Sequence, residues 1–483
     1  MNDKDLVVTR YAPSPTGYMH IGNLRTALYS YLLARHNKGK FILRIEDTDK
    51  ERQVEGAEQV IYDTLKIAGL DYDEGPDKGG QNGPYVQSER KEIYLKYAQK
   101  LVDEGKAYYC FCTKEEMQAN SQEFGGYNRH CRDLSAEEVQ DKLASGKPYV
   151  IRHKANLEGQ TKYFDHIFGE IVVENSTLND IVLIKSDGFP TYNFAHIIDD
   201  HLMGVTHVVR GNEYIISTPQ YVQLHDALGF DLPEYYHLPL IMGKNADGEV
   251  SKLSKRHGAV SFADLINLGY LPEAIINYIA LLGWHLGESE QEFFTLAELE
   301  QVFDASDIRK SAAIFDYEKL KWMNSKYISN LAEEEFLKYA EPYFAKLPSN
   351  IDRSKLVELL KPRIQIFSEI SEKIGFFEQM PEFDLGLLIN PKKKTDLDCS
   401  KVILERALVE LSNLEQAEWV NDNLFAVLEK ISADSGFKAM SVMWVVRLAV
   451  SGNVVTVGGA TEIMQVLGKD ESLRRIKLTL ERI

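Results

Sequence analysis

The first 70 residues alternate short apolar runs with longer amphipathic segments, and this alternation constrains the fold more than any other feature. Apolar runs at 6–11 and 41–45 have the length of buried strands. Segments 22–39 and 54–68 carry apolar residues at helical spacing, and a glycine closes each of them. Strand, helix, strand, helix in this order predicts a parallel sheet with right-handed crossover connections, and therefore an α/β fold.

The alternation then stops and later resumes. Residues 85–190 form a mixed polar stretch, which we interpret as an inserted α+β domain. Strand and helix signals return between 181 and 241, and a loop rich in glycine and lysine follows at 243–258. From about residue 262 strand signals fade and helical spacing dominates to the end, with a break at 390–394. We therefore expect a third, all-helical part of the chain.

Charge and cysteine content exclude several classes of protein. The 483 residues carry a formal net charge of −18, which argues against a protein that coats nucleic acid by bulk charge, although a local basic surface stays open. Four cysteines are too few for a disulfide framework, and no apolar run reaches the ~18 residues of a membrane span. No apolar targeting run follows Met1, so we expect a cytoplasmic protein with no membrane partner and no DNA partner.

A polar segment at 13–23 stands where the first expected strand gives way to the first helix. In an open α/β sheet, ligands bind at the carboxyl ends of strands, and a helix N-terminus there offers free N–H groups to phosphate. His20 can donate a hydrogen bond to a phosphate oxygen, and Gly22 lets a nucleotide base approach the backbone. By itself this His-x-Gly element is weak evidence, because a turn with a capping histidine has the same sequence.

A basic pentamer, KLSKR at 252–256, follows the second strand–helix region. Three cations in five residues are typical of a solvated turn. Together with HIGN at 20–23, however, the pentamer closely resembles the two signature sequences of class I aminoacyl-tRNA synthetases. That resemblance implies adenylyl transfer from ATP, in which His20, Lys252 and Lys255 stabilise the charge on the leaving pyrophosphate. Asn23 stands where the first signature usually ends in histidine, so no second catalytic imidazole is expected there.

Further blocks narrow the resemblance to bacterial glutamyl-tRNA synthetases. The likeness runs from residue 6 to about 330 and continues more weakly to the end. It implies a Rossmann-like catalytic domain that uses ATP and Mg²⁺. The blocks are RYAPSPTG at 10–17, RIEDTD at 44–49, SDGFPTYNFA at 186–195, DDHLMG at 199–204, HVVRG at 207–211, LPEA at 271–274 and LLGW at 281–284. By the same resemblance, the ATP site comprises His20, Gly22, Asn23, Glu213, Tyr214, Lys252, Ser254 and Lys255.

Glutamate as the substrate agrees with the residue types at the expected strand ends. Arg10 and Arg210 each end a strand, and the planar fork of arginine suits a carboxylate. Glu46 is the natural partner for the substrate ammonium. Which arginine takes the side-chain carboxylate stays open. The resemblance implies that the amino-acid site comprises Arg10, Ala12, Ser14, Glu46, Tyr192, His196 and Arg210.

Three neighbouring positions admit two interpretations. His196 lies one helical turn after Tyr192, so it either lines the pocket or packs beneath it. Asp199 and Asp200 invite an acid–base role. Activation needs no protein base, however, because the substrate carboxylate is already the nucleophile. We therefore expect these two carboxylates to be buried and hydrogen-bonded.

Three cysteines fall close together in the expected insertion. Cys110, Cys112 and Cys131 supply three soft ligands, whereas zinc takes four in a tetrahedron. Some members of the resembled family carry Cys-x-Cys and Cys-x-His pairs in this insertion, but here the final histidine is missing. A structural zinc site and three free thiols both stay open. The fourth ligand would be His130, Tyr127 or Asp133.

Contact with tRNA is expected in two places. The insertion at 87–191 resembles the acceptor-end domain of the family, and the helical region at 329–483 resembles its anticodon-binding part. Arg363 matches a family arginine that reads the last anticodon letter, where it would favour cytosine, so tRNA-Glu alone is the expected partner. The alternative is an arginine that faces solvent at a helix start.

The expected organisation is a catalytic domain at 1–86 and 192–245, the insertion at 87–191, a signature-loop and stem-contact domain at 246–328, and two helical subdomains at 329–483 that meet near 390. We predict a monomeric glutamate–tRNA ligase. The rivals are a glutaminyl enzyme, a shorter glutamyl transferase that modifies a tRNA base, a small nucleotidyltransferase, and an inactive RNA-binding paralogue. The helical C-terminal part argues against the first two, the long insertion and the helical tail argue against the third, and the two intact ATP motifs argue against the fourth.

Overall fold

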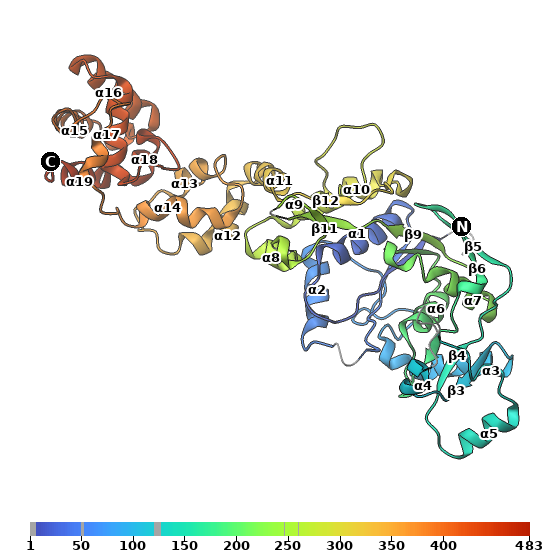
Figure 1. Ribbon diagram of the computed structural model, residues 1–483. Helices are drawn as coiled ribbons and strands as arrows, with labels where there is room; N and C mark the ends of the chain where they lie inside the picture. Colours follow the sequence, from blue (N-terminus) through green and yellow to red (C-terminus); the bar gives the residue numbers. More distant parts are fainter. Residues whose placement is uncertain (1–5, 50–52, 120–126, 246, 259) are drawn as a thin grey trace. The chain divides into compact units, whose positions relative to one another are not determined.

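The computed structural model describes residues 6–49, 53–119, 127–245, 247–258 and 260–483. The chain forms two compact units (Figure 1). The first comprises Met1–Leu265 and Ile275–Asp316, and the second comprises Ile266–Ala274 and Tyr317–Ile483. None of the described helices combines the length and the hydropathy needed to cross a membrane. The finer domain boundaries expected from sequence stay predictions.

The first strands of unit 1 are parallel, as the alternation predicts. Strands β1 (Val8–Tyr11) and β2 (Lys40–Leu43) pair in register from Val8↔Lys40, with α1 (Ile21–His36) between them in the chain. Helix α1 is buried along most of its length, and the buried residues include the polar Arg25 and Ser30 as well as its apolar side chains. Helix α2 (Ala57–Ile67) follows, and Gly69 comes directly after its end in a left-handed conformation.

A second sheet, in the order β6-β5-β9-β8, stands beside β1. Strands β8 (His207–Gly211) and β9 (Glu234–Leu238) are parallel, connected through α7 (Thr218–Leu228). The other two strands, β5 (Gln160–Asp165) and β6 (Gly169–Glu174), form a hairpin from within the predicted insertion. Because β5 pairs with β9 at Asp165↔Tyr235, part of the insertion completes the sheet that carries β8.

The remainder of the insertion is α+β, as expected. Its antiparallel sheet has the order β3-β4-β7, and strand β7, which we expected to restart the βα alternation, instead pairs antiparallel with β4. Helix α6 (Tyr192–Leu202) follows β7. The elements are β3 (Ala107–Cys110), β4 (Val150–His153), β7 (Val182–Ile184), α3 (Lys91–Asp103), α4 (Lys114–Ala119) and α5 (Ala136–Ala144).

The region after residue 240 corrects two expectations. The glycine- and lysine-rich loop contains paired strands β10 (Ile241–Lys244) and β11 (Val250–Lys252). A third strand, β12 (Ala313–Phe315), pairs parallel with β10 although no strand was expected after about 262. These short strands lack the apolar runs that mark β1 and β2 in the sequence, so only their pairing defines them. The helices here are α8 (Phe262–Asn267), α9 (Pro272–Ala280) and α10 (Leu296–Val302).

Residues 317–483 are helical and contain no β-strand, which confirms the expected all-helical region. Helix α13 (Arg353–Leu360) ends two residues before Pro362, because proline lacks the N–H that would continue the hydrogen-bond ladder. Buried aliphatic and aromatic side chains form the core of this unit. Its helices are α11 (Tyr317–Asn330), α12 (Glu333–Phe344), α13 (Arg353–Leu360), α14 (Ile370–Glu378), α15 (Leu397–Ser412), α16 (Asn421–Ser435), α17 (Ala439–Ser451), α18 (Ala460–Leu467) and α19 (Lys469–Leu480).

Candidate active site

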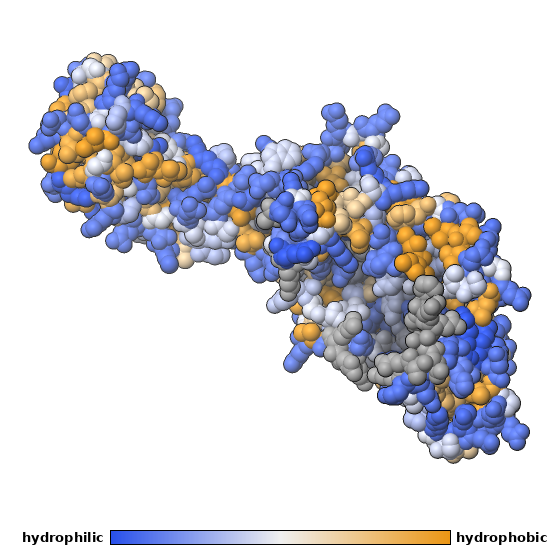
Figure 2. All heavy atoms as spheres, in the orientation of Figure 1, coloured by the Kyte–Doolittle hydropathy of each residue, from blue (hydrophilic) through white to orange (hydrophobic). Residues whose placement is uncertain are grey.

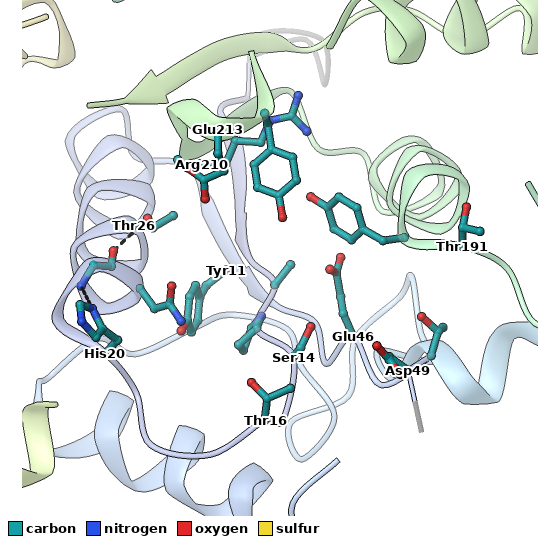
Figure 3. Close-up of a pocket in the computed structure, with 18 of the residues that line it drawn as sticks. Tyr11, Ser14, Thr16, His20, Thr26, Glu46, Asp49, Thr191, Arg210 and Glu213 are labelled. Atoms are coloured by element: carbon teal, nitrogen blue, oxygen red, sulfur yellow. Dashed lines mark hydrogen bonds between the residues drawn. The ribbon is translucent and has the colours of Figure 1, made fainter. Parts of the chain in front are cut away.

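A cavity of about 1590 Å³ opens within unit 1, where the ends of β1 and β8 meet the start of α1 (Figure 3). Its size exceeds the ~300–1,000 Å³ of a typical single-ligand site, so it can accommodate more than one small molecule. Its wall brings together residues expected to bind ATP and residues expected to bind glutamate. They are Arg10, Ala12, Ser14, His20, Gly22, Asn23, Glu46, Tyr192, Arg210, Glu213, Tyr214, Lys252 and Ser254.

His20 caps α1 in a defined orientation. Its Nδ1 accepts a hydrogen bond from the Gly22 backbone N–H at 3.1 Å. Burial, and then the nearby charge of Lys252, lower the pKa of His20, so the ring is neutral at physiological pH. A neutral ring that accepts at Nδ1 carries its proton on Nε2, which can donate to a phosphate oxygen.

The basic loop reaches the same cavity through β11. Lys252 ends that strand and is exposed, and Leu253 anchors the loop by burial. His257 accepts the Ser254 backbone N–H at 3.0 Å. A Cβ at Gly243 would lie 2.7 Å from the ring of His257, so a glycine is needed there. The backbone of Lys255 begins the short 3₁₀ helix Lys255–His257, but its side chain lies outside the described part of the structure.

Arg10 is buried beside a second arginine, and both contact carboxylates from α6. The Nε of Arg10 lies 3.2 Å from Asp200 Oδ1, and Arg44 Nη1 lies 2.7 Å from the same oxygen. Burial alone would raise the pKa of Asp200, but these two guanidinium groups hold it well below its usual range. Arg90 Nε donates to Asp199 at 2.7 Å. We name the group the paired-arginine cluster; it comprises Arg10, Arg44, Arg90, Glu46, Asp199 and Asp200.

The cluster places Asp199 and Asp200 as expected from the sequence, buried and hydrogen-bonded. Asp199 also accepts from the Tyr94 hydroxyl at 2.9 Å and from Gln87 Nε2 at 2.8 Å. With all these donors in place, the two aspartates fix arginines and have no geometry for proton transfer to a ligand.

Glu46 belongs to the cluster and also faces the cavity (Figure 3). Arg44 Nη2 donates to its Oε1 at 3.0 Å. Burial raises the pKa of Glu46 to about 7, although Arg44 and Arg10 oppose that shift. A buried carboxylate that titrates near neutrality is well suited to a cationic ligand group, because the ligand charge would favour its ionised form.

Arg210 has a different environment from the clustered arginines. It donates from Nε to His237 at 3.0 Å and from Nη2 to Thr218 Oγ1 at 2.7 Å. Its Nη1 is buried and has no hydrogen-bond partner. Among the carboxylates that the structure describes, none comes within 4.0 Å of Arg210, and its guanidinium instead lies 5.1–5.4 Å from the ring centres of Tyr214, Tyr221 and Tyr235.

His196 lies behind the cavity wall. Its ring stacks on Tyr192 at 4.8 Å, and its Nδ1 lies 2.8 Å from the Tyr192 carbonyl oxygen. Of the two arrangements considered from sequence, packing beneath the wall describes this geometry. Tyr192 itself lines the cavity and contacts the ring of Tyr214 at 5.3 Å.

Comparison with known proteins gives a consistent family. Residues 6–322 match the family described as tRNA synthetases class I (E and Q), catalytic domain, and residues 335–480 match the anticodon binding domain. The chain belongs to the class I tRNA synthetases of the E and Q type. It is 52% identical to glutamate–tRNA ligase of Clostridium tetani, covering 98% of this chain and 97% of that protein. The corresponding protein of Clostridium kluyveri is 53% identical, covering 99% of this chain and 98% of that protein.

Solved structures agree with the sequence relatives. A crystal structure of a glutamate tRNA ligase from Elizabethkingia meningosepticum, in complex with its amino acid, superposes with a TM-score of 0.90 at 35% identity. It covers 98% of this chain and 99% of that one. The glutamate–tRNA synthetase of Elizabethkingia anophelis gives 0.87 at 34% identity over 99% of this chain and all of that one. The predicted family and fold class are therefore confirmed.

Several residues that shape the synthetase site were missed by sequence reasoning. Arg44, Gln87 and Arg90 hold the two aspartates, and His237 and Thr218 hold Arg210. The sequence does carry a signal for Arg44, which opens one of the recognised blocks. His237 and Thr218 have no motif, because strand and helix residues of these types are common.

The synthetase also contains the three clustered cysteines. The sulfur atoms of Cys110, Cys112 and Cys131 lie within 4.8 Å of one another. The Tyr127 hydroxyl lies 3.2 Å from Cys110 Sγ, and the Phe111 backbone N–H donates to Cys131 Sγ at 3.4 Å. The Cys131 thiol lowers the pKa of Cys110, although burial opposes the shift. Three convergent thiols with a low-pKa member fit the ligand set that zinc prefers.

The fourth position is more restricted than the sequence allowed. The Tyr127 hydroxyl touches the cluster and also accepts the Cys131 backbone N–H at 3.1 Å. The side chain of Asp133 is 85% exposed and pairs with Lys154 at 3.5 Å, so it is directed elsewhere. His130 is exposed. Tyr127 is therefore the candidate that the geometry favours.

Arg363 lies in the second unit, just after α13. Its Nη1 donates to the Leu359 carbonyl at 3.0 Å, and its Nη2 pairs with Glu462 at 2.6 Å. Its side chain is 37% exposed. It is thus neither free in solvent nor buried.

A cavity of about 430 Å³ lies beside Glu462 in the same unit. Trp444, Arg447 and Lys393 line it, and the guanidinium of Arg447 lies 5.0 Å from the centre of the Trp444 ring. Trp444 Nε1 and Arg447 Nε are buried without hydrogen-bond partners. Phe425 also lines it and is 44% exposed; Figure 2 shows hydrophobic residues among hydrophilic ones on the visible face of these helices. This cavity combines a stacking surface with unused donors.

Proposed function

We propose that the chain is a glutamate–tRNA ligase. The observation that carries this proposal is its near-complete overlap, at about half identity, with relatives named glutamate–tRNA ligase. The cavity of unit 1 supports it independently, because the ATP motifs and a buried set of arginines and a glutamate line the same space. The expected site of action remains the cytoplasm.

The reaction has two steps. A carboxylate oxygen of glutamate attacks the α-phosphorus of ATP, used as its Mg²⁺ complex, and the bond to the β-phosphate oxygen breaks to release pyrophosphate. The 2′-hydroxyl of the terminal adenosine of tRNA then attacks the glutamyl carbonyl and releases AMP. The charge that develops on the phosphates would be stabilised by the Nε2–H of His20 and by the ammonium groups of Lys252 and Lys255, all of which belong to the two ATP motifs.

Glutamate binds, in this proposal, between Arg210 and Glu46. The unpaired Nη1 of Arg210 receives a carboxylate oxygen, and the carboxylate of Glu46 receives the ammonium. Tyr192 and Ser14 line the space between them. Arg10 is already paired with Asp200, so its guanidinium is not free to bind a substrate carboxylate in a bidentate manner. Its contribution is the positive potential that it adds at the cavity wall.

ATP–pyrophosphate exchange with each amino acid, with and without tRNA-Glu, tests the assignment. Glutamate-dependent exchange is expected, with glutamine far less effective. Exchange that depends on glutamine alone would favour the glutaminyl enzyme, and no exchange with any amino acid would favour an inactive paralogue.

We further propose a structural zinc ion on Cys110, Cys112, Cys131 and Tyr127. Bound there, the ion would cross-link two segments of the insertion. Purified protein should carry about one equivalent of zinc, since structural sites bind a single ion. Cys112→Ser should lower both the zinc content and the melting temperature, whereas Cys399→Ser, outside the cluster, should leave the zinc content unchanged. Metal-free wild-type protein with an unaltered melting temperature would refute the proposal.

For tRNA, we propose that the second cavity and Arg363 contact the anticodon. An unstacked base would lie on Trp444, and Arg447 and Lys393 would approach its phosphates. Trp444→Ala should raise the KM for tRNA and leave the KM values for glutamate and ATP unchanged. Arg363→Ala should relax discrimination against tRNA-Gln. Efficient charging of tRNA-Gln by the unaltered protein would refute the role of Arg363.

A further inference from the structure

Arg210 is held from behind by a neutral group, and that is unusual for a buried cation. Buried charges are ordinarily paired with an opposite charge, because burial without a partner is costly. Arg10 and Arg44 follow that rule and contact carboxylates directly. Arg210 donates instead to the imidazole of His237 and the hydroxyl of Thr218.

The hydrogen bonds behind His237 fix which of its nitrogens can accept. His237 Nδ1 lies 2.6 Å from Asp165 Oδ2, and both side chains are completely buried. Asp165 also accepts the backbone N–H groups of Ile167 at 2.9 Å, Phe168 at 2.7 Å and His237 at 3.2 Å. Both oxygens of Asp165 thus face N–H donors, so Asp165 acts as a hydrogen-bond acceptor towards the imidazole as well. The imidazole proton must therefore lie on Nδ1, which leaves the lone pair of Nε2 for the Nε–H of Arg210.

The two contacts together determine the direction of Arg210. With Nε on His237 and Nη2 on Thr218, the planar guanidinium has no rotational freedom, and Nη1 is the group left without a partner. Burial lowers the pKa of His237, opposed by its hydrogen bond to Asp165, so no second cation forms next to Arg210 at neutral pH. Asp165 does not contact Arg210 directly; the imidazole of His237 lies between them.

We propose that His237 is a positioning residue for substrate binding, which Asp165 locks in the Nδ1–H tautomer so that Arg210 presents Nη1 and an unneutralised charge to a carboxylate of the amino acid. The inference rests on the proposed function. Its physical basis is that a carboxylate in the place of His237 would also orient Arg210, but it would neutralise the charge that the substrate needs. A neutral acceptor supplies the geometry and leaves the charge available.

The origin of Asp165 gives the arrangement a second consequence. Asp165 ends β5, in the hairpin that comes from the predicted insertion, whereas His237 lies on β9 and Arg210 on β8. Three adjacent strands thus contribute one residue each. The pocket for the amino acid is therefore incomplete without the hairpin.

A matched pair of substitutions tests the role of His237. His237→Asn keeps a donor near the Nδ1 position for Asp165 but removes the acceptor for Arg210. His237→Gln keeps an acceptor near the Nε2 position. Both are measured in tRNA-dependent exchange. The Asn variant should raise the KM for glutamate at least about tenfold with a smaller change in kcat, because a buried donor loses its partner. The Gln variant should recover most of the loss, and the KM for ATP should not change in either.

Three outcomes would overturn the proposal: an unchanged KM for glutamate in the Asn variant, equal losses in both variants, or a parallel rise in the KM for ATP. Should neither variant fold, ¹⁵N chemical shifts of histidine-labelled wild-type protein keep the test open, with Asp165→Asn used to identify the His237 signals. A protonated Nδ1 and a bare Nε2 are expected, and an Nε2–H tautomer or an imidazolium at pH 7 would contradict it. The exchange assay on wild-type protein separates the proposed function from the proposed role of His237. Absence of glutamate-dependent exchange in wild-type protein would count against the proposed function, whereas the two His237 variants test the positioning role.

Discussion

Two arginine environments border the same cavity, and they differ in whether the arginine charge is compensated by protein carboxylates. In the paired-arginine cluster three guanidinium groups face three carboxylates, so the charges compensate within the protein. On the other side Arg210 meets an imidazole and a hydroxyl, and its charge is left over. The paired-arginine cluster fixes the cavity wall, whereas the positive charge of Arg210 can pair with a ligand. An arginine in a binding pocket is thus informative only once its partners are known.

Removing a charge from the paired-arginine cluster should have the largest effect, on stability. Asp200→Asn leaves Arg10 and Arg44 without their shared carboxylate, and breaking a buried ion pair costs about 3–5 kcal/mol. Denaturant unfolding of the variant should show a loss of this size. Asp103→Asn, which changes an exposed aspartate on α3, provides the control and should change the unfolding free energy by less than about 0.5 kcal/mol. Similar small losses in both variants would mean that the cluster is not a compensated unit.

Removing the charge of Arg210 should separate activity from stability. Arg210→Met should lower kcat/KM for glutamate roughly 30- to 5,000-fold, since losing a buried charged hydrogen bond to a ligand costs about 2–5 kcal/mol. The loss of stability should be smaller than for Asp200→Asn, because His237 and Thr218 lose a hydrogen-bond donor but no carboxylate loses its partner. Steady-state exchange and thermal melting measure the two effects. A loss of stability as large as that of Asp200→Asn would show that Arg210 is compensated after all.

Loosening Arg210 without removing it should have an intermediate effect. Thr218→Val deletes the acceptor for Nη2 with little change of shape, and an unsatisfied buried donor costs about 1–3 kcal/mol. The KM for glutamate should rise by roughly 5- to 150-fold, whereas Thr218→Ser, which keeps the hydroxyl, should stay near the wild-type value. A Ser variant as impaired as the Val variant would point to packing of the methyl group instead.

The smallest effect concerns Glu46, which belongs to the paired-arginine cluster yet faces the cavity. Its pKa of about 7 means that it loses its charge, and its attraction for an ammonium, as the pH falls below 7. The KM for glutamate should rise about fivefold between pH 7 and pH 6, and it should be nearly constant above pH 8. Glu46→Gln should abolish this dependence. A KM that is flat from pH 6 to pH 8 in the wild-type protein would contradict the role.

The same pKa has a consequence for the free protein. Because the folded-state pKa of Glu46 lies above its ordinary value of 4.5, the folded state binds the proton more tightly than the unfolded state does. The contribution of Glu46 to stability therefore decreases as the pH rises from 4.5 towards 7. Bound substrate ammonium would offset that loss by stabilising the ionised form.

Much of the fold was predictable, and the failures share one cause. The βα pairs with long apolar runs, such as β1 with α1, were recognised because many residues contribute to the same periodic signal. Strands β10, β11 and β12 were missed because their sequences carry no long apolar run, and β12 pairs with β10 only across a long stretch of chain. The hairpin β5–β6 lies within the stretch expected to be an α+β insertion, but neither the hairpin itself nor its pairing with β9 was predicted.

The site shows the same division. The ATP and glutamate residues with described side chains were named from motifs, and all except His196 line one cavity, although their roles stay predictions. The sequence left open whether His196 lines the cavity or packs behind it, and whether a fourth ligand completes the cysteine cluster. The stacking of His196 on Tyr192 agrees with packing behind the cavity, and the contact of Tyr127 with Cys110 makes Tyr127 the candidate fourth ligand of the proposed zinc site.

The sequence by itself determined the family and the two-part ATP signature, and it supplied the predicted residues of the amino-acid site, because motifs keep chemically constrained residues close together in the chain. Only the tertiary structure decided which charges are compensated. Arg10 meets a carboxylate 190 residues away, and the chain from Asp165 through His237 to Arg210 joins three strands. Electrostatic pairing depends on distances of a few ångströms between side chains, and such distances are set by the packing of distant segments and not by their spacing in sequence.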